Sequence, residues 1–161
     1  MNTGKAEFLK KDFIPLLAKI PSDTKPNWGK MTLQQMIEHF SDAVRIASGK
    51  TAVLSIVTPE AHLQKMQDFI MSDKPFRENT VNVLLPETPA PVRNKTIESA
   101  LKELQSELAY FFTVFENAAN LKSRNPIFGD LSFEQNIHLL YKHAQHHLRQ
   151  FGIDITVPTI I

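Results

Sequence analysis

Residues 132–152 read SFEQNIHLLYKHAQHHLRQFG, and this stretch decides the expected fold. Ser132 and Gln135 have the Ser-x-x-Gln spacing of a capping box, which starts helices. Gly152 is the residue type that commonly follows the last helical turn, and no proline interrupts the stretch. The pattern therefore predicts a helix over 133–151.

Three of the six histidines of the chain lie in one window of five consecutive residues in this helix, 143–147. Residues four apart share one helix face, with Cβ atoms roughly 6 Å apart, so His143 and His147 point the same way. His146 is rotated by about 100° from His147 and points elsewhere. An H-x-x-x-H pair supplies two ligands of a metal site, and a third has to come from another part of the chain.

A second capping box, formed by Thr32 and Gln35, predicts a helix over 32–48 that ends at Gly49. Its apolar positions follow a helical period. His39 lies three residues after Met36, on the flank of the apolar stripe that these positions form. It therefore faces the interior of the helix bundle or the opening of that interior. This histidine is the natural third ligand. The stripe consists of Leu33, Met36, Ile37, Phe40, Val44 and Ala47.

Apolar residues at helical spacing predict further helices over 5–20 and 96–120, and a modest one over 60–71. Pro15 lies inside the first and removes one backbone donor. We therefore expect a kink there, or a helix that restarts with Pro15 in its first turn. Pro59 is expected at the first position of the short helix.

The connections are expected to be irregular. Segment 51–57 is short and isolated and is predicted to be loop or extended chain, and 122–131 contains proline and glycine and is predicted to be a loop. Four prolines between 72 and 94 favour an extended crossover. The apolar tail 153–161 is expected to pack back over a hydrophobic face.

Together these elements predict an all-α protein. Four main helices would form a four-helix bundle, with one long crossover between the second and the third and a short extra helix. A length of 161 residues fits one domain, 1–161, that is large enough to bury a core.

Composition limits the kinds of binding partner, location and metal ligand that are expected. A net charge of +1, with no basic block, argues against a nucleic-acid partner. No stretch approaches the roughly 20 apolar residues of a membrane span, and no secretory signal is recognisable, so a cytoplasmic location is expected. The chain has no cysteine, so any metal must be held by imidazole and carboxylate groups.

His39, His143 and His147 would place three imidazoles between two helices. Three neutral nitrogen ligands suit Zn²⁺, Ni²⁺ or Fe²⁺ and leave positions open for a substrate. The competing interpretation is that the spacing arises by chance, since H-x-x-x-H pairs occur on many helices without a metal.

The neighbours of this triad have more than one interpretation. His146 is expected either to face solvent or to support the ligands, and Gln150 is a neighbour of the site. Trp28 either staples the entry to the helix over 32–48 or lines a pocket. Glu38 points about 100° away from its neighbour His39 and is expected to be a solvated carboxylate. The remaining histidines, His62 and His138, are expected to be ordinary surface or hydrogen-bonded residues.

The residues quoted so far resemble the DinB-like, or YfiT-like, superfamily. Its members carry a histidine on the second helix and a run like H-x-x-H-H-x-x-Q on the last, which stand here as His39 and residues 143–150. The fragments at 28–31 and 150–152 are similar to a bacterial DinB-like subfamily of unknown function. The chain differs in having Leu-Arg at 148–149, where many members have Arg-Gly.

This resemblance implies an up-up-down-down bundle that holds a divalent metal, often nickel or zinc, at His39, His143 and His147. Some members are thiol-dependent transferases or isomerases that use mycothiol or bacillithiol, and many are homodimers. Two hypotheses follow. The first is a metal-dependent enzyme that activates a thiol or water for transfer or hydrolysis on a small molecule. The second is a non-catalytic bundle that binds a ligand or a protein, with structural or vestigial histidines.

Overall fold

The computed structural model describes residues 3–79 and 84–155, and within them the chain is mostly helical with one small two-stranded sheet. Helix α3 (Leu33–Ser48) begins with the predicted capping box, in which the Thr32 hydroxyl accepts from Gln35 N–H and the Gln35 side chain accepts from Thr32 N–H. It ends at Gly49, whose φ of 80° is left-handed.

The N-terminal segment is helical over residues 3–18 but irregular just before Pro15. It consists of α1 (Thr3–Glu7), a π-helical turn (Phe8–Asp12) and α2 (Phe13–Ala18). Pro15, which has no backbone N–H to donate, lies in the first turn of α2. An α-helical stretch therefore begins with Pro15 in its first turn, as the restart alternative expects, but the chain stays helical through the π-helical turn before it.

The other predicted helices are present with small shifts. Helix α4 (Glu60–Met71) is preceded by Pro59, which is its N-cap and not its first residue as expected. Helix α5 (Ile97–Asn117) ends three residues before the predicted end, because Ala118 leaves helical geometry at φ −148°. Helix α6 (Phe133–Gln150) has the predicted capping box.

The expected loop at 122–131 contains a hairpin, and that expectation is wrong. Strands β1 (Ser123–Asn125) and β2 (Gly129–Leu131) pair antiparallel. The Asn125 side-chain oxygen accepts from the N–H groups of Ile127 and Phe128 and so stabilises the turn. Strands of three residues are too short to produce a readable alternation of apolar and polar positions.

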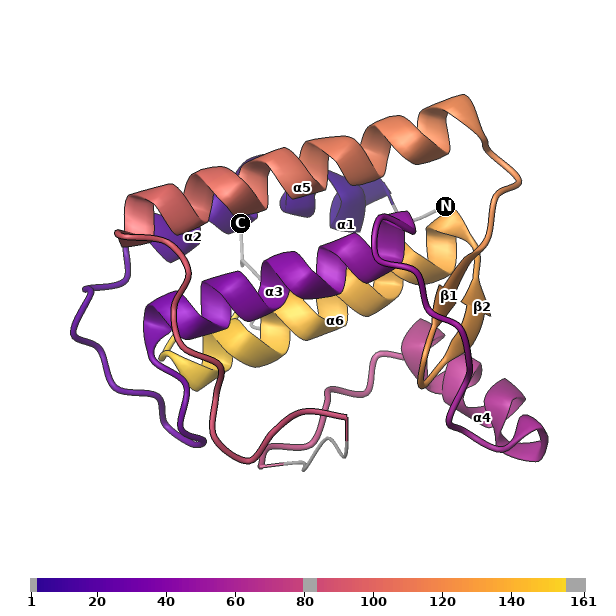
Figure 1. Cartoon of the computed structure of the whole chain (residues 1–161), viewed down its shortest axis with the longest axis horizontal. Helices are drawn as coiled ribbons and strands as arrows, with labels where there is room; N and C mark the ends of the chain where they lie inside the picture. The colour runs from indigo at the N-terminus through magenta and orange to yellow at the C-terminus, as the bar shows by residue number, and fades with distance from the viewer. Residues whose placement is uncertain (1–2, 80–83, 156–161) are drawn as a thin grey trace, which may run out of the picture.

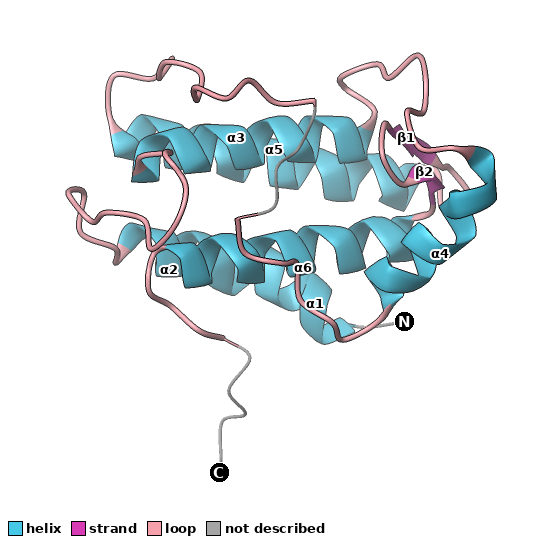
Figure 2. Ribbon diagram, turned by 90° about the horizontal axis from the view of Figure 1, so that it is seen from below, coloured by secondary structure: helices cyan, strands magenta, loops and turns pink. Residues whose placement is uncertain are grey.

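Helix α3 lies along α5, while the N-terminal segment and α6 lie against them (Figure 1, Figure 2). Helices α3 and α5 run in the same direction, and the N-terminal segment and α6 run in the opposite one (Figure 1). Ion pairs support the parallel course of α3 and α5: Arg45 binds Glu103, and Lys50, just past the end of α3, binds Glu107 further along α5.

The expected up-up-down-down order is therefore wrong, because the first two of these segments are antiparallel. The reason is the number of long connections. An up-up-down-down bundle needs two long crossovers. This chain has one, from α3 through α4 to α5, and it joins the two parallel helices.

The main hydrophobic core lies between these helices. Phe13 of α2, Phe40 of α3 and Phe111 of α5 are fully buried in it. Ile153 and Ile155 pack against this core, as expected for the start of the tail, whereas 156–161 lie outside the described residues. A smaller cluster joins α4, the hairpin and α6, and consists of Ile70, Phe128, Leu131 and Leu139.

Glu38 is buried, at 3% exposure, and the expectation of a solvated carboxylate is wrong. Its carboxylate accepts from the backbone N–H groups of Arg93 and Asn94, at 2.8 and 3.1 Å, and from the side chains of Asn94 and Gln34. Burial alone would raise the pKa of Glu38, but these hydrogen bonds hold the pKa below its ordinary value. Glu38 thus fixes the end of the crossover to α3.

Replacing Glu38 by Gln is expected to lower the free energy of unfolding at neutral pH by roughly 1–3 kcal/mol. The amide NH₂ of Gln would face one of the N–H groups of Arg93 and Asn94 that now donate to the carboxylate, and that hydrogen bond would be lost. The native carboxylate has a pKa below that of the unfolded chain, so the unfolded state binds more protons as pH falls below about 4.5. The Glu38 contribution is then lost in acid. Chemical denaturation should show a difference between parent and E38Q that is largest at neutral pH and shrinks as pH falls through this window; a constant difference contradicts the assignment.

No helix among the described residues combines the length and the apolar character that crossing a membrane requires.

Candidate metal centre

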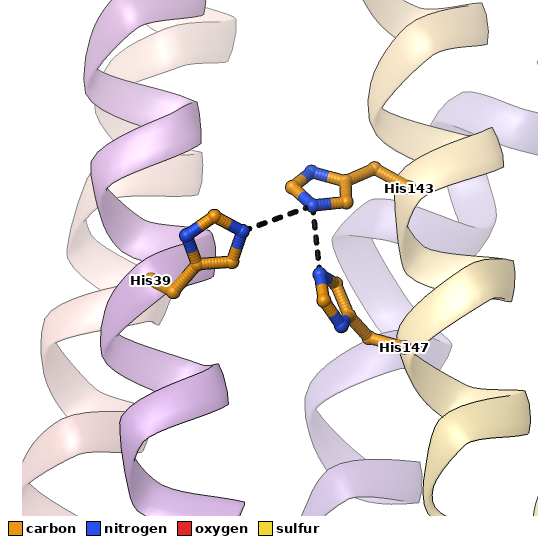
Figure 3. Close-up of side chains that lie close together, drawn as sticks. All are labelled: His39, His143 and His147. Carbon is orange, nitrogen blue, oxygen red and sulfur yellow. Dashed lines mark hydrogen bonds between the residues drawn. The ribbon is translucent and has the colours of Figure 1, made fainter. Parts of the chain in front are cut away.

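Three histidine side chains from two helices converge at one point (Figure 3). His39 reaches out from α3, and His143 and His147 reach out from successive turns of α6. The Nε2 atom of His143 lies 2.8 Å from that of His147 and 3.3 Å from that of His39. The ligand atoms of all three lie within 4.8 Å of one another. The three residues that the sequence predicts as metal ligands therefore do lie together in the structure.

Two of the three separations are close to those of a metal site. Two nitrogen ligands at roughly 2.0–2.1 Å from one ion, at the angles of tetrahedral or octahedral coordination, lie about 3.0–3.4 Å apart. The distances from His143 Nε2, 2.8 and 3.3 Å, are close to this range. The three histidines can hold a metal ion.

Gln150 fixes the tautomer of His147. The Nε2 group of Gln150 donates to the backbone carbonyl of Trp28 at 2.9 Å, and a carbonyl can only accept. The amide oxygen Oε1 must then face His147 Nδ1, which is 2.8 Å away, so Nδ1 carries the hydrogen and donates it. The lone pair of His147 is left on Nε2, which points at the other two histidines.

Gly29 leaves room for this contact. Its φ is +78°, a conformation that glycine tolerates best, and a Cβ at this position would lie 3.0 Å from Nε2 of Gln150. A side chain at 29 would therefore push Gln150 away from the Trp28 carbonyl.

Burial keeps the three imidazoles neutral. It lowers the pKa of His39, and together with the neighbouring imidazoles it holds the pKa values of His143 and His147 well below the ordinary range. His147 is 3% exposed, and the other two are half-buried. Neutral imidazole is the form that binds metal, so these ligands need lose no proton near neutral pH.

Aromatic rings cover part of the cluster. The ring of Phe40 lies 4.9 Å from that of His143, and the ring of Phe76 lies 6.3 Å from it. Phe76 follows α4 and is half-buried. Sequence patterns gave no sign of this residue near the site, because it lies in the irregular crossover.

Lys142 holds the segment that carries Phe76. It is buried on α6, and its ammonium group donates to the backbone carbonyls of Ser72, at 2.8 Å, and of Lys74. It also lies 4.6 Å from the centre of the Phe69 ring. Burial lowers the pKa of Lys142. This side chain was not identified from the sequence, where it reads as an ordinary lysine.

His146 does not belong to the ligand cluster, but it touches it. Its ring lies 5.2 Å from that of His147, 5.3 Å from Trp28 and 5.9 Å from Phe76. Burial, with the nearby Arg149 charge, lowers the pKa of His146 to about 4. Trp28 lies against His146 and lines a cleft, so the pocket alternative describes it better than the staple.

The other two histidines lie apart from the cluster. His62 is exposed near the start of α4, and His138 is half-buried on α6. Neither belongs to the group whose ligand atoms converge.

Comparison of the chain with protein-family models, with curated proteins and with solved structures found no match. The class of site is therefore defined by the chain's own residues, as a three-histidine cluster between two helices that can hold a metal ion.

Replacing Gln150 by Leu is expected to weaken Zn²⁺ binding by roughly 10–100-fold, the usual cost of losing a partner that orients a histidine ligand. The dissociation constant can be measured by competition with a chromophoric chelator. Gln145→Leu, on the same helix but outside the cluster contacts, is the matched control and should bind like the parent. An unchanged dissociation constant in Q150L would contradict the role given to Gln150.

Proposed function

We propose that this protein is a divalent-metal-dependent enzyme of the DinB-like superfamily. In this proposal the N-terminal helical segment, α3, α5 and α6 form one four-helix bundle domain. His39, His143 and His147 hold the metal, with nickel or zinc as the expected ion and iron as the alternative. The observation that carries the proposal is the convergence of three Nε2 atoms, with the lone pair of His147 aimed at the others through Gln150.

The proposed reaction is a thiol-dependent transfer, or a hydrolysis, on a small molecule. A bound divalent ion is a Lewis acid that favours the thiolate form of a thiol and polarises an oxygen. The chain itself supplies neutral ligands, a fixed His147 orientation and an apolar cover of Phe40 and Phe76 that limits access of water. Three protein ligands leave coordination positions for the thiol or the substrate.

The aromatic cover also favours a second candidate, a non-catalytic bundle whose metal site is structural. His147 is almost fully buried, and two phenylalanine rings lie against His143. If these rings closed every remaining coordination position, the metal would stabilise the fold without meeting a substrate.

Cobalt substitution distinguishes the two candidates. The Co²⁺-loaded chain is titrated with 2-mercaptoethanol and followed by absorption spectroscopy. A sulfur-to-cobalt charge-transfer band that saturates with thiol is expected for the enzyme, because an open position accepts the thiolate. Full cobalt loading without such a band at any thiol concentration would reject the thiol-dependent function and favour the structural site.

A further inference from the structure

A cleft of about 390 Å³ lies beside the three-histidine cluster, at the C-terminal end of α6. Its volume falls in the range of small-molecule sites. The segment around Trp28 is joined to α6 there: the N–H of Asn27 donates to the Gln150 carbonyl at 2.7 Å, and the Asn27 side chain donates to the Arg149 carbonyl at 3.1 Å. The cleft is thus built on backbone hydrogen bonds, and its lining includes Asn27, Trp28, Glu78, Arg149, Ile153 and Asp154.

Two polar atoms at this end of α6 are without partners. The Nε of Arg149 and the Nδ1 of His146 are both buried, and neither has a hydrogen-bond partner among the described residues. The two residues are three positions apart on α6, so they are neighbours on one face. Buried polar groups are nearly always paired, and an unpaired one calls for an explanation.

Within the described part of the chain, no direct ion pair joins Arg149 to a carboxylate, although Glu78 and Asp154 border the same cleft. The other described arginines that form ion pairs do so at the surface or between α3 and α5. A guanidinium group only donates hydrogen bonds, so its missing partner must be an acceptor, and an anion suits it best.

The remaining lining selects among anions. Glu78 and Asp154 also border the cleft, so an anion binds there only through a close contact with Arg149, and a dianion such as phosphate is repelled more strongly than a monoanion. Trp28 offers an indole ring on which a planar group can stack. An acid with one carboxylate and a planar apolar body meets both conditions.

Two chains of contacts connect the lining of the cleft to the histidine cluster. The Trp28 ring contacts His146, whose ring contacts His147. The Trp28 carbonyl binds Gln150, which in turn binds Nδ1 of His147. A ligand seated against Trp28 and Arg149 is therefore one residue removed from His147, with His146 and Gln150 between them.

We propose that Arg149 and Trp28 form a carboxylate-binding subsite, which takes a planar monocarboxylic acid as the substrate, or part of the substrate, of the proposed enzyme. This inference rests on the proposed function for its catalytic meaning, but binding of the carboxylate needs only the cleft. The Arg149 guanidinium holds the carboxylate, and the Trp28 ring packs on the body of the ligand.

Trp28 is the only tryptophan of the chain, so its fluorescence reports on the cleft directly. Benzoate is titrated into the full chain, both as purified and after treatment with chelator, and benzamide serves as the uncharged counterpart. Saturable quenching by benzoate is expected in both preparations, with binding by benzamide weaker by roughly tenfold or more. Equal binding of the two probes would overturn the proposal.

Variants locate the carboxylate. Arg149→Gln should weaken benzoate binding by roughly tenfold or more, whereas Arg149→Lys should retain part of it because the charge remains. Arg124→Gln, which removes an exposed arginine paired with Asp130 in the hairpin, is the matched control and should bind like the parent. Circular dichroism verifies that each variant is folded. Unchanged benzoate binding in folded R149Q would reject the subsite.

The benzoate experiment can fail or succeed independently of the metal proposal. Benzoate binding by a chain that never takes up metal would retain the subsite and reject the metal-dependent function. Stoichiometric metal with no benzoate binding would do the reverse.

Discussion

His147→Ala is expected to abolish stoichiometric metal binding while the helix content stays close to that of the parent. His147 Nε2 is one of the three ligand atoms that converge within residues 3–79 and 84–155, and its lone pair is directed by Gln150. Losing a direct ligand should cost more than the roughly 10–100-fold that follows from losing a residue that orients one. The measurement is a competition titration with Zn²⁺ and Ni²⁺, beside circular dichroism of the metal-free chain.

His138→Ala is the matched control for this experiment. His138 lies on the same helix and is half-buried, but it is outside the cluster of ligand atoms. It should leave the dissociation constant unchanged. Full retention of metal by H147A, or equal losses in both variants, would contradict the assignment of the site.

Phe111→Ala is expected to lower the free energy of unfolding by about 3–5 kcal/mol, the usual cost of removing a buried phenylalanine ring. Phe111 of α5 is 0% exposed, and its ring lies 5.1 Å from Phe115 and 5.8 Å from Phe133 at the start of α6. The variant leaves a cavity where α5 meets α6. For a chain of this length the midpoint of thermal unfolding should fall by about 6–20 °C.

Tyr110→Ala provides the comparison. Tyr110 precedes Phe111 on α5 but is 42% exposed, and the Lys50 ammonium group lies 4.3 Å from the centre of its ring. Its removal should cost less than about 1 kcal/mol. Denaturant unfolding of both variants measures the two costs. Similar small losses in F111A and Y110A would mean that α5 does not pack through Phe111.

The helices could be predicted because their signals are local. The capping boxes at Thr32 and Ser132 are complete within four residues, and both are present in the structure. The apolar periodicity then placed His39 on an inward flank of α3, and the spacing of His143 and His147 placed them on one face of α6. The meeting of the three followed from these two local facts.

Features that depend on distant partners could not be predicted in this way. Glu38 looked solvated because its partners, the backbone N–H groups of Arg93 and Asn94, are more than fifty residues away. Helix direction follows from the single long crossover, which joins two parallel helices, whereas the up-up-down-down order that the family resemblance implies needs two such crossovers.

The surroundings of the site show the same division. Gln150 is a candidate site residue because it is close to the histidines in the sequence. Its role, however, depends on the Trp28 carbonyl, 122 residues away along the chain. Arg149 could have been noticed, since it lies three residues after His146 on the same helix face. That it lines a cleft depends on Asn27 and Trp28, which only the folded chain brings to the end of α6.

The most direct test of the account is the metal content per chain, by elemental analysis of untagged protein purified without chelator, beside His39→Ala. His39 is the one ligand that comes from α3, so its loss tests the convergence of two helices and not the sequence pair alone. The account predicts near-stoichiometric nickel or zinc in the parent and its loss in folded H39A. A parent that binds no metal even after reconstitution, or an H39A that retains all of it, would contradict the central claim.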